Sequence, residues 1–250
     1  MARACRQEGL EEVFRGGLAE AFAEYMLSLW DRGLREARLV YELLSRHGVG
    51  PGSSVLELGA GVGRVAVPLA RMGYRVTGVE YSPLFVRIGR ERVLREGVGV
   101  ELLEGDAWSL DDVLGDRVFD AAYMVWSTLL GYAGEECDLE LLSGVARHVR
   151  RGGLLVIANT VSYDMEGLLA SCMCRGPFIT FYGGYAVVEE PRFDPVSQVL
   201  ESRWVFYRVE GRDLRFIGET RFRLRVYTLK ELVELAGRAG WRLEAAYSDP

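Results

Sequence analysis

A short apolar segment that leads straight into a glycine-rich loop constrains the fold of this chain more than any other feature. Residues 55–58 are apolar apart from Glu57, and the next five residues are Gly59, Ala60, Gly61, Val62 and Gly63. A strand that ends in such a loop before a helix brings backbone N–H groups close to a ligand, because glycines carry no side chain there. The loop alone fits a tight turn equally well, so the surrounding pattern has to decide.

Strands and helices alternate regularly around this loop. Short apolar runs predict strands, and apolar residues at three- and four-residue spacing predict helices between them. The predicted strands cover residues 55–58, 75–79, 100–103, 119–124 and 154–158, and the helices cover 64–72, 83–96 and 135–149. This order indicates right-handed βαβ units in an α/β fold with a Rossmann-like, doubly wound, mostly parallel sheet.

The segments on either side of this core follow different patterns. Residues 10–47 have helical periodicity, whereas residues 176–227 contain no convincing helix. Residues 203–209 are strand-like, and residues 221–227 alternate polar and apolar as a half-buried antiparallel strand does. Thr228 and Glu231 predict a capping box, and a last strand is expected at 241–247. We therefore expect four parts: an N-terminal helical cap (1–50), a cofactor-binding core (51–160), an antiparallel insertion over the active site after strand five (161–227), and a core helix and strand (228–250).

Glu80, which ends the second predicted strand, makes the loop more specific. An acidic residue about 20 positions after the first glycine of such a loop can accept both hydroxyls of a ribose. Dinucleotide-binding enzymes share this pair, but they need a small residue where this chain has Arg64. Glu57, just before the loop, favours a ligand that carries a cationic amine and no pyrophosphate.

These residues resemble the motifs of class I S-adenosylmethionine-dependent methyltransferases, in particular the members that act on small molecules. The similarity lies in six segments in the family's order: 55–64, 79–83, 104–107, 119–124, 150–156, and 227–232 with 239–241. The resemblance implies a Rossmann-like fold and S-adenosylmethionine as the cofactor.

The resemblance also implies roles for individual residues. Gly59 and Gly61 would pass under the methionine part of the cofactor, Glu57 would meet its ammonium group, and Glu80 would hold the ribose. Asp106 would accept a hydrogen bond from the adenine amino group. The full set of expected cofactor-binding residues is Glu57, Gly59, Ala60, Gly61, Gly63, Glu80, Tyr81, Asp106, Ala107, Trp108 and Met124.

The methyl acceptor is harder to place. The sulfonium is already an activated methyl donor, so alignment supplies much of the rate, and a base is needed only when the nucleophile starts protonated. The residues expected near the acceptor are Tyr132, Tyr163 and Asp164 as candidate catalytic groups and Trp126, Tyr182 and Tyr185 as candidate substrate-binding groups. The Asn/Asp-Pro-Pro-aromatic tetrad of enzymes that methylate nucleic-acid amino groups is missing after strand four.

Composition narrows the partners. The formal net charge of −6 gives no excess of basic residues for nucleic acid, and no apolar stretch is long enough to span a membrane. The four cysteines make no paired ligand set, so no metal is expected and reduced cytosolic thiols are. We expect a cytoplasmic protein with a small-molecule substrate, and a homodimer is conceivable through the free edge of the insertion.

One compositional feature points to the source. Asn159, Gln7 and Gln198 are the only side-chain amides in the sequence, and depletion of these thermolabile residues fits a heat-adapted organism.

Three functional hypotheses follow. The leading one is methyl transfer from S-adenosylmethionine to a small molecule by direct in-line displacement. The second is a non-catalytic module that binds the cofactor and regulates a partner, which remains open because no single base stands out. The third is an NAD-dependent oxidoreductase; it lacks a Tyr-x-x-x-Lys pair, since Lys230 is the only lysine.

Overall fold

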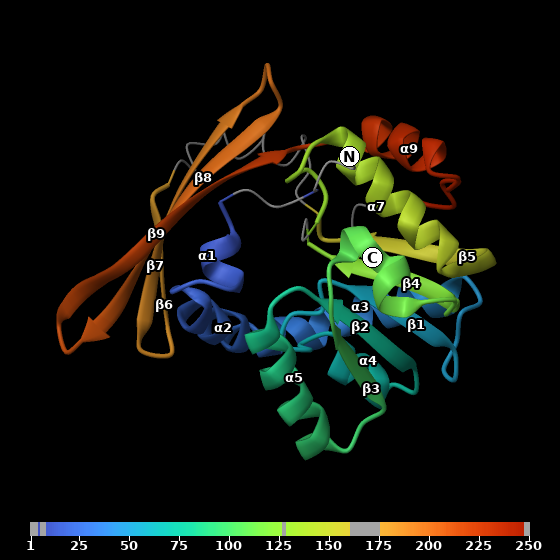
Figure 1. Ribbon diagram of the computed structural model, residues 1–250, viewed down its shortest axis with the longest axis horizontal. Coiled ribbons are helices and arrows are strands. Elements are labelled where there is room, and N and C mark those ends of the chain that lie inside the picture. Colours follow the sequence, from blue (N-terminus) through green and yellow to red (C-terminus); the bar gives the residue numbers. More distant parts are fainter. Residues whose placement is uncertain (1–4, 6–8, 127–128, 161–175, 248–250) are drawn as a thin grey trace.

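The computed structural model describes residues 5, 9–126, 129–160 and 176–247, which contain two separate sheets (Figure 1). The first is parallel, with strand order β3-β2-β1-β4-β5, and the second is antiparallel, with order β6-β7-β8-β9. The strands of the parallel sheet are β1 (Ser54–Leu58), β2 (Arg75–Glu80), β3 (Val100–Glu104), β4 (Phe119–Val125) and β5 (Val149–Ala158). Those of the antiparallel sheet are β6 (Phe178–Tyr182), β7 (Tyr185–Asp194), β8 (Val199–Glu210) and β9 (Asp213–Arg225). The predicted fold class is confirmed.

Helices cover both faces of the parallel sheet. They are α3 (Trp30–Arg46), α4 (Ala66–Arg71) and α5 (Pro83–Glu96) with, on the opposite face, α6 (Leu110–Leu114), α7 (Glu135–Arg147) and α9 (Leu229–Arg238). Because both faces are buried, β1 and β4 are almost wholly apolar. Leu56 and Met124 pack under α7, while Val55 and Tyr123 pack under α3 and α4.

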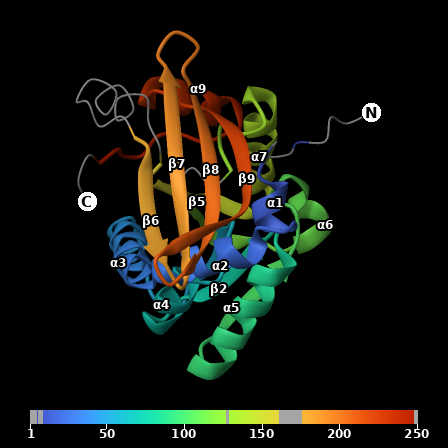
Figure 2. The ribbon, with the colours of Figure 1, turned by 90° about the vertical axis from the view of Figure 1, so that its left-hand side faces the viewer.

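One face of the antiparallel sheet lies against the rest of the molecule (Figure 2), and buried apolar side chains are on that face. Its strands β6 and β7 are joined by Gly183 and Gly184, which both have positive φ. Alternate residues face the rest of the molecule and include five aromatic side chains: Tyr182, Tyr185, Trp204, Phe206 and Phe222. On the outer face, Phe181 and Phe216 are exposed. The period-two pattern of the sequence therefore reports a sheet with one buried face.

The helical N-terminal segment divides into three helices, α1 (Glu11–Phe14), α2 (Ala19–Ser28) and α3. The first two lie between the two sheets, and α3 lies against the parallel one (Figure 1). Phe22 in α2 contacts both Phe85 of α5 and Trp204 of β8, with ring centroids 5.9 and 5.6 Å apart. The segment thus fills the space between the sheets, where their aromatic side chains meet.

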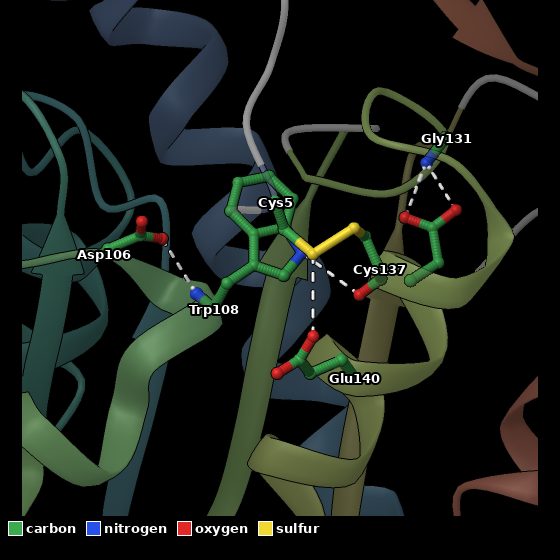
Figure 3. Close-up of a disulfide and its surroundings, with 7 residues drawn as sticks. Cys5, Asp106, Trp108, Gly131, Cys137 and Glu140 are labelled. Carbon is green, nitrogen blue, oxygen red and sulfur yellow. Dashed lines mark hydrogen bonds between the residues drawn. A yellow bond between two sulfur atoms is a disulfide. The ribbon is translucent and has the colours of Figure 1, made fainter. Parts of the chain in front are cut away.

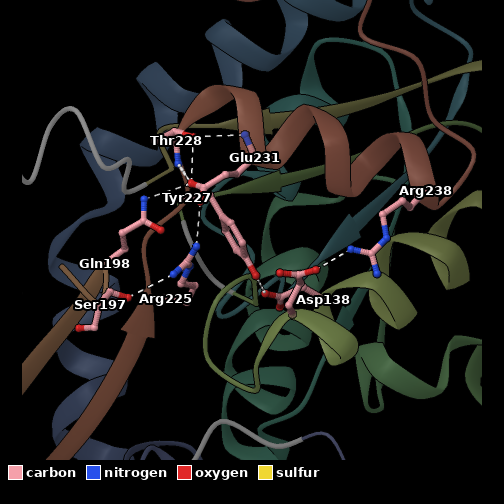
Figure 4. A network of polar contacts seen from close by, with 9 residues as sticks. Asp138, Ser197, Gln198, Arg225, Tyr227, Thr228, Glu231 and Arg238 are labelled. Carbon is pink, nitrogen blue, oxygen red and sulfur yellow. Dashed lines mark hydrogen bonds and ion pairs between the residues drawn. The ribbon is translucent and has the colours of Figure 1, made fainter. Parts of the chain in front are cut away.

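A polar network joins the end of the antiparallel sheet to the parallel one (Figure 4). Thr228 and Glu231 form the predicted capping box at the start of α9. Next to them, Tyr227 donates a hydrogen bond of 2.6 Å to Asp138 on α7. Burial raises the pKa of Asp138 to about 6, although this hydrogen bond lowers it. The contacts fix the place where the chain returns from the insertion to the core.

The final strand expected at residues 241–247 is not formed, so that prediction is wrong. Leu243 and Tyr247 are largely exposed, and no ladder joins this segment to β5. Instead, the Tyr247 hydroxyl lies 3.0 Å from Nε2 of His47, and Arg46 lies over its ring. The segment packs by its aromatic end on the end of α3 rather than by backbone pairing.

Within the described ranges, no helix has the length and apolar character needed to cross a membrane. The part of the chain that the structure describes also brings together no group of three histidine, cysteine, aspartate or glutamate side chains that could hold a metal ion.

Candidate active site

The glycine loop adopts the conformation that its composition requires. Gly59, Gly61 and Gly63 have φ values of 67°, 56° and 78°, a region that other residues rarely occupy. The amides of Gly59 and Ala60 both donate to the carbonyl of Val79, at 2.9 and 3.1 Å, which holds the loop against the end of β2. The loop therefore runs beside the carboxyl ends of β1 and β2, where sheets of this kind bind ligands.

Glu80 is locked to that loop. Its carboxylate accepts a hydrogen bond of 2.8 Å from the amide of Gly61 and one of 2.7 Å from the amide of Ser82. Burial raises the pKa of Glu80, and these backbone hydrogen bonds lower it. A carboxylate has about four lone-pair sites, so a side chain oriented by these backbone amides can still accept hydrogen bonds from hydroxyl groups.

Glu57 is the most unusual polar group of the site. It is 3% exposed, and its Oε2 atom has no hydrogen-bond partner among the described residues. Burial raises its pKa to about 8. Tyr123 pairs with Glu57 on the neighbouring strand β4, and its hydroxyl is close enough to lower the pKa of Glu57. That hydroxyl forms no hydrogen bond of ordinary length and angle among the described residues. A buried carboxylate oxygen without a hydrogen-bond partner, next to a glycine loop, indicates a polar ligand.

A pocket of about 560 Å³, partly open to solvent, lies at the ends of β1, β2 and β3. Asp106 accepts a hydrogen bond of 2.9 Å from the backbone amide of Trp108 and so caps the short helix η1 (Ala107–Ser109). The predicted cofactor residues that line the pocket are Gly59, Glu80, Tyr81, Asp106, Ala107 and Trp108. The structure thus brings together residues from three separate motifs.

Other predicted cofactor residues lie outside the pocket lining. Glu57, Ala60, Gly61 and Gly63 belong to the adjoining loop and strand, and Met26 of α2 covers the loop: its Cε would lie 3.4 Å from a Cβ at Gly61. The remaining residue, Met124, is fully buried in the core under α7.

Part of the pocket wall comes from the N-terminal segment, which no motif indicated. Cys5, Glu11 and Phe14 line it together with the predicted residues. Arg15 packs over the Tyr81 ring at 3.9 Å from its centroid and donates to its backbone carbonyl at 2.7 Å. The sequence predicted helices in residues 10–47, but it did not predict that their side chains line the pocket. The segment shows no motif of polar residues that would indicate a ligand.

A disulfide joins Cys5 to Cys137 at this wall (Figure 3). The expectation of reduced thiols is therefore wrong for this pair. The two residues are 132 positions apart, and folding brings their Cα atoms to 5.6 Å, so sequence spacing could not reveal the bond. The indole N–H of Trp108 donates to the carbonyl of Cys137 at 3.1 Å, so the cross-link lies beside the expected adenine site.

A buried cluster of charges lies at the ends of β4 and β5. Glu36 of α3 forms a salt bridge with Arg64, and both are almost fully buried. Glu36 also accepts from Arg32 at 3.0 Å and from the indole of Trp126 at 2.6 Å. Trp126 has a φ of 67°, which is an outlier for a bulky residue, and its ring is flanked by the two arginines. Trp126 is thus anchored directly after the carboxyl end of β4.

The residues expected near the methyl acceptor come from different parts of the chain. Tyr132 packs against Phe222, with ring centroids 5.8 Å apart, and burial raises its pKa above the ordinary range. Tyr182 and Tyr185 stack on each other at 6.1 Å. Tyr163 and Asp164 lie outside the described residues.

Known proteins support the sequence motifs. Residues 55–153 match the model of a family described as a methyltransferase domain. The cypemycin N-terminal methyltransferase of a Streptomyces species is 35% identical over 111 residues, which are 44% of this chain and 43% of that protein. The demethylmenaquinone methyltransferase of Tropheryma whipplei is 34% identical over 115 residues, 45% of this chain and 44% of that protein. The chain spans less than half the length of these curated relatives.

Solved structures extend the likeness across the second sheet. The CcbJ methyltransferase from Streptomyces caelestis superimposes with a TM-score of 0.66 and 26% identity, covering 85% of this chain and 80% of that one. S-adenosylmethionine-bound CalS10, an amino pentose methyltransferase from Micromonospora echinaspora, has the same fold, with a TM-score of 0.62, 21% identity and coverage of 86% and 87%.

The parallel sheet, the glycine loop and the acidic residues at the strand ends define the class I S-adenosylmethionine-dependent methyltransferases. Within that class, residues 55–153 belong to the methyltransferase domain family. S-adenosylmethionine is accordingly the cofactor, and the unpartnered carboxylate oxygen of Glu57 fits its ammonium group. The nicotinamide alternative is disfavoured by the same match.

Proposed function

We propose that the chain transfers the methyl group of S-adenosylmethionine to a small-molecule acceptor by direct in-line displacement. The observation that carries the proposal is Glu57, whose buried, unpartnered carboxylate oxygen stands beside the glycine loop. Such a group is costly unless a cation or donor meets it. The cofactor supplies a methyl group already activated on a sulfonium, so the chain has to bind and orient more than it has to activate.

The residues divide this work between them. Glu57 would hold the ammonium group, the loop from Gly59 to Gly63 would allow close approach, and Glu80 would hold the ribose hydroxyls. Asp106, Ala107, Trp108 and Tyr81 would surround the adenine, with Met124 behind them. The aromatic side chains of the second sheet would exclude water from the acceptor and place its nucleophile.

The division of the chain belongs to the same proposal. Residues 51–160 and 228–250 would form the cofactor-binding core, while 1–50 and 161–227 would enclose the acceptor. We further propose a cytoplasmic location. A disulfide in that compartment fits the heat-adapted source that the scarcity of side-chain amides suggests, because intracellular disulfides are common in hyperthermophiles.

Isothermal titration with S-adenosylhomocysteine tests the cofactor site. We expect saturable binding that weakens in Glu57→Gln, whereas Glu42→Gln, at an exposed position of α3, leaves it unchanged. No binding at millimolar ligand would overturn the proposal. Incubation with methyl-labelled S-adenosylmethionine and a panel of metabolites then separates an enzyme from a non-catalytic module, since only an enzyme passes label to an acceptor.

A further inference from the structure

The Cys5–Cys137 disulfide joins two walls of the pocket that come from distant parts of the chain (Figure 3). Cys5 belongs to the N-terminal segment and lines the pocket, whereas Cys137 lies near the start of α7. The bond therefore belongs to the wall of the site where the cofactor is expected, and its loss should be felt there.

The wall on the Cys137 side carries residues expected beside the adenine. The backbone carbonyl of Cys137 accepts the indole N–H of Trp108 at 3.1 Å, and Trp108 lines the pocket. Trp108 belongs to the short helix η1, which Asp106 caps through a hydrogen bond of 2.9 Å from the Trp108 amide. The position of Cys137 thus helps to set the positions of both predicted adenine neighbours.

The wall on the Cys5 side is held by separate contacts along its length. From Gly9 onward its anchors are non-covalent, and they include the hydrogen bond that the Thr220 hydroxyl donates to the Gly9 carbonyl. Cys5 itself is held to α7 by the disulfide. A carboxylate oxygen of Glu140 lies 3.6 Å from the Cys5 sulfur, but a thiol is only a weak hydrogen-bond donor. Reduction should therefore release Cys5 from the pocket wall while the segment from Gly9 onward stays in place.

The pocket offers a route to the disulfide. Cys5 is 7% exposed and Cys137 is 3% exposed, so little of either residue meets solvent. Of the two, Cys5 lines the pocket, which is partly open. A ligand whose adenine lies against Trp108 would fill this space and cover Cys5. A reductant and the ligand should therefore exclude each other from the pocket.

We propose that the Cys5–Cys137 disulfide positions the adenine end of the cofactor site, so that cofactor affinity depends on the oxidation state of this pair. Because coupling between two equilibria is reciprocal, a bound cofactor in turn stabilises the disulfide against reduction. Both cysteines are positioning residues, since they act through Trp108 and the N-terminal wall. The inference rests on the proposed function, which assigns this pocket to the adenine.

The reductant that the proposal requires is a dithiol. One of its thiolates attacks the Cys5 sulfur from the pocket, the bond between the two cysteines breaks, and Cys137 leaves as a thiolate that takes up a proton. The second thiol of the reductant then displaces Cys5 from the mixed disulfide and closes a cyclic disulfide. The protein gains two electrons and two protons, and the dithiol loses the same.

Isothermal titration with S-adenosylhomocysteine compares the oxidised protein with the protein reduced by dithiothreitol. We expect affinity to fall at least about tenfold on reduction, because the ligand then has to order a wall that is no longer fixed. Cys5→Ser should bind as weakly as the reduced protein, and dithiothreitol should not change its affinity further. Circular dichroism checks that the compared forms are folded. Equal affinity of the folded oxidised and reduced forms would overturn the inference.

The rate of reduction tests the same linkage on the unaltered protein, and it decides the question even when the reduced form unfolds. Thiols that appear at Cys5 and Cys137 are trapped with iodoacetamide and counted by mass spectrometry. If the empty pocket admits the reductant, S-adenosylhomocysteine at 100 times its dissociation constant should slow reduction about hundredfold. A low, non-denaturing concentration of urea should leave the rate of the ligand-free protein nearly unchanged.

Two results of the rate measurement contradict the inference. An unchanged rate with ligand bound would mean that the ligand does not cover Cys5, and a steep rise of the rate with urea would mean that reduction requires unfolding. Failure of the oxidised protein to bind S-adenosylhomocysteine contradicts the proposed function instead.

Discussion

The two sheets of this molecule assemble their functional side chains in opposite ways. In the parallel sheet, the candidate ligand-binding residues lie at the carboxyl ends of β1, β2 and β3, as a few contiguous residues at each end. In the antiparallel sheet, they come from alternate positions of strands that are paired over long distances. The parallel sheet with its helices, called the cofactor half below, buries several charged side chains. The inner face of the antiparallel sheet carries mainly apolar and aromatic side chains. The residues expected to bind the cofactor are thus specified by short local motifs, whereas the inner face of the antiparallel sheet is specified by strand pairing.

The largest change in stability is expected when the Cys5–Cys137 disulfide is reduced. The Cys5–Cys137 disulfide closes a loop across 132 positions that contains β1 to β4. Because it restricts the unfolded chain, its reduction should lower the free energy of unfolding by roughly 5 kcal/mol. Urea denaturation with and without dithiothreitol measures this, with Cys5→Ser as the control that reductant should not affect. An equal loss in that control would attribute the effect to other thiols.

Removing the buried carboxylate of Glu36 should be nearly as damaging. Glu36→Ala leaves Arg64 buried without its counter-ion, which costs about 3–5 kcal/mol. Glu42→Ala, an exposed position on the same helix, should stay within about 0.5 kcal/mol of the parent. Chemical denaturation compares the two. A small loss in Glu36→Ala would mean that buried charge does not distinguish the cofactor half.

Glu57 should affect the ligand more than the fold. Glu57→Gln removes the carboxyl group that we expect to ionise and pair with the ammonium group when the ligand binds, so affinity for S-adenosylhomocysteine should fall roughly 10- to 100-fold, or about 1.4–2.8 kcal/mol. Isothermal titration measures the change. Unaltered affinity, with the variant folded, would remove Glu57 from the site and weaken the argument that short motifs encode it.

The pH dependence of stability gives a finer test of the same residue. Between the ordinary glutamate pKa of 4.5 and about 8, the folded protein holds a proton on Glu57 that the unfolded chain has lost. The folded state therefore binds more protons, and stability falls as pH rises through this window, by at most about 1.4 kcal/mol per pH unit. Unfolding of the parent and of Glu57→Gln between pH 5 and 9 should diverge accordingly, and parallel curves would contradict the raised pKa.

The smallest effect is expected on the outer face of the antiparallel sheet. Phe216 is 58% exposed, so Phe216→Ser should change stability by about 0.5 kcal/mol or less. Phe206→Ala, on the buried face of β8, should cost about 3–5 kcal/mol because Phe206 is 1% exposed. Thermal unfolding of both variants compares the faces. Similar losses would show that the outer face is covered in solution.

The sequence predicted most of the cofactor half because its determinants are contiguous. The glycine loop follows β1 directly, Glu80 is the last residue of β2, and Asp106 comes two positions after β3. The strands themselves follow from apolar runs. The antiparallel half was predicted only as a sheet, since no local signal tells which residues of β7 and β8 face each other. The disulfide and the missing strand at 241–247 escaped for the same reason: each depends on which distant segment lies nearby.

The ion pair between Glu36 and Arg64 has a consequence for how such proteins can be recombined. Glu36 lies in the N-terminal helices, and Arg64 comes directly after the glycine loop. Each segment therefore carries a buried charge whose counter-ion belongs to the other segment. A chimera that exchanges residues 1–50 between relatives would inherit half of a buried pair. Exchange of the N-terminal helices should therefore succeed only when the positions of Glu36 and Arg64 are transplanted together.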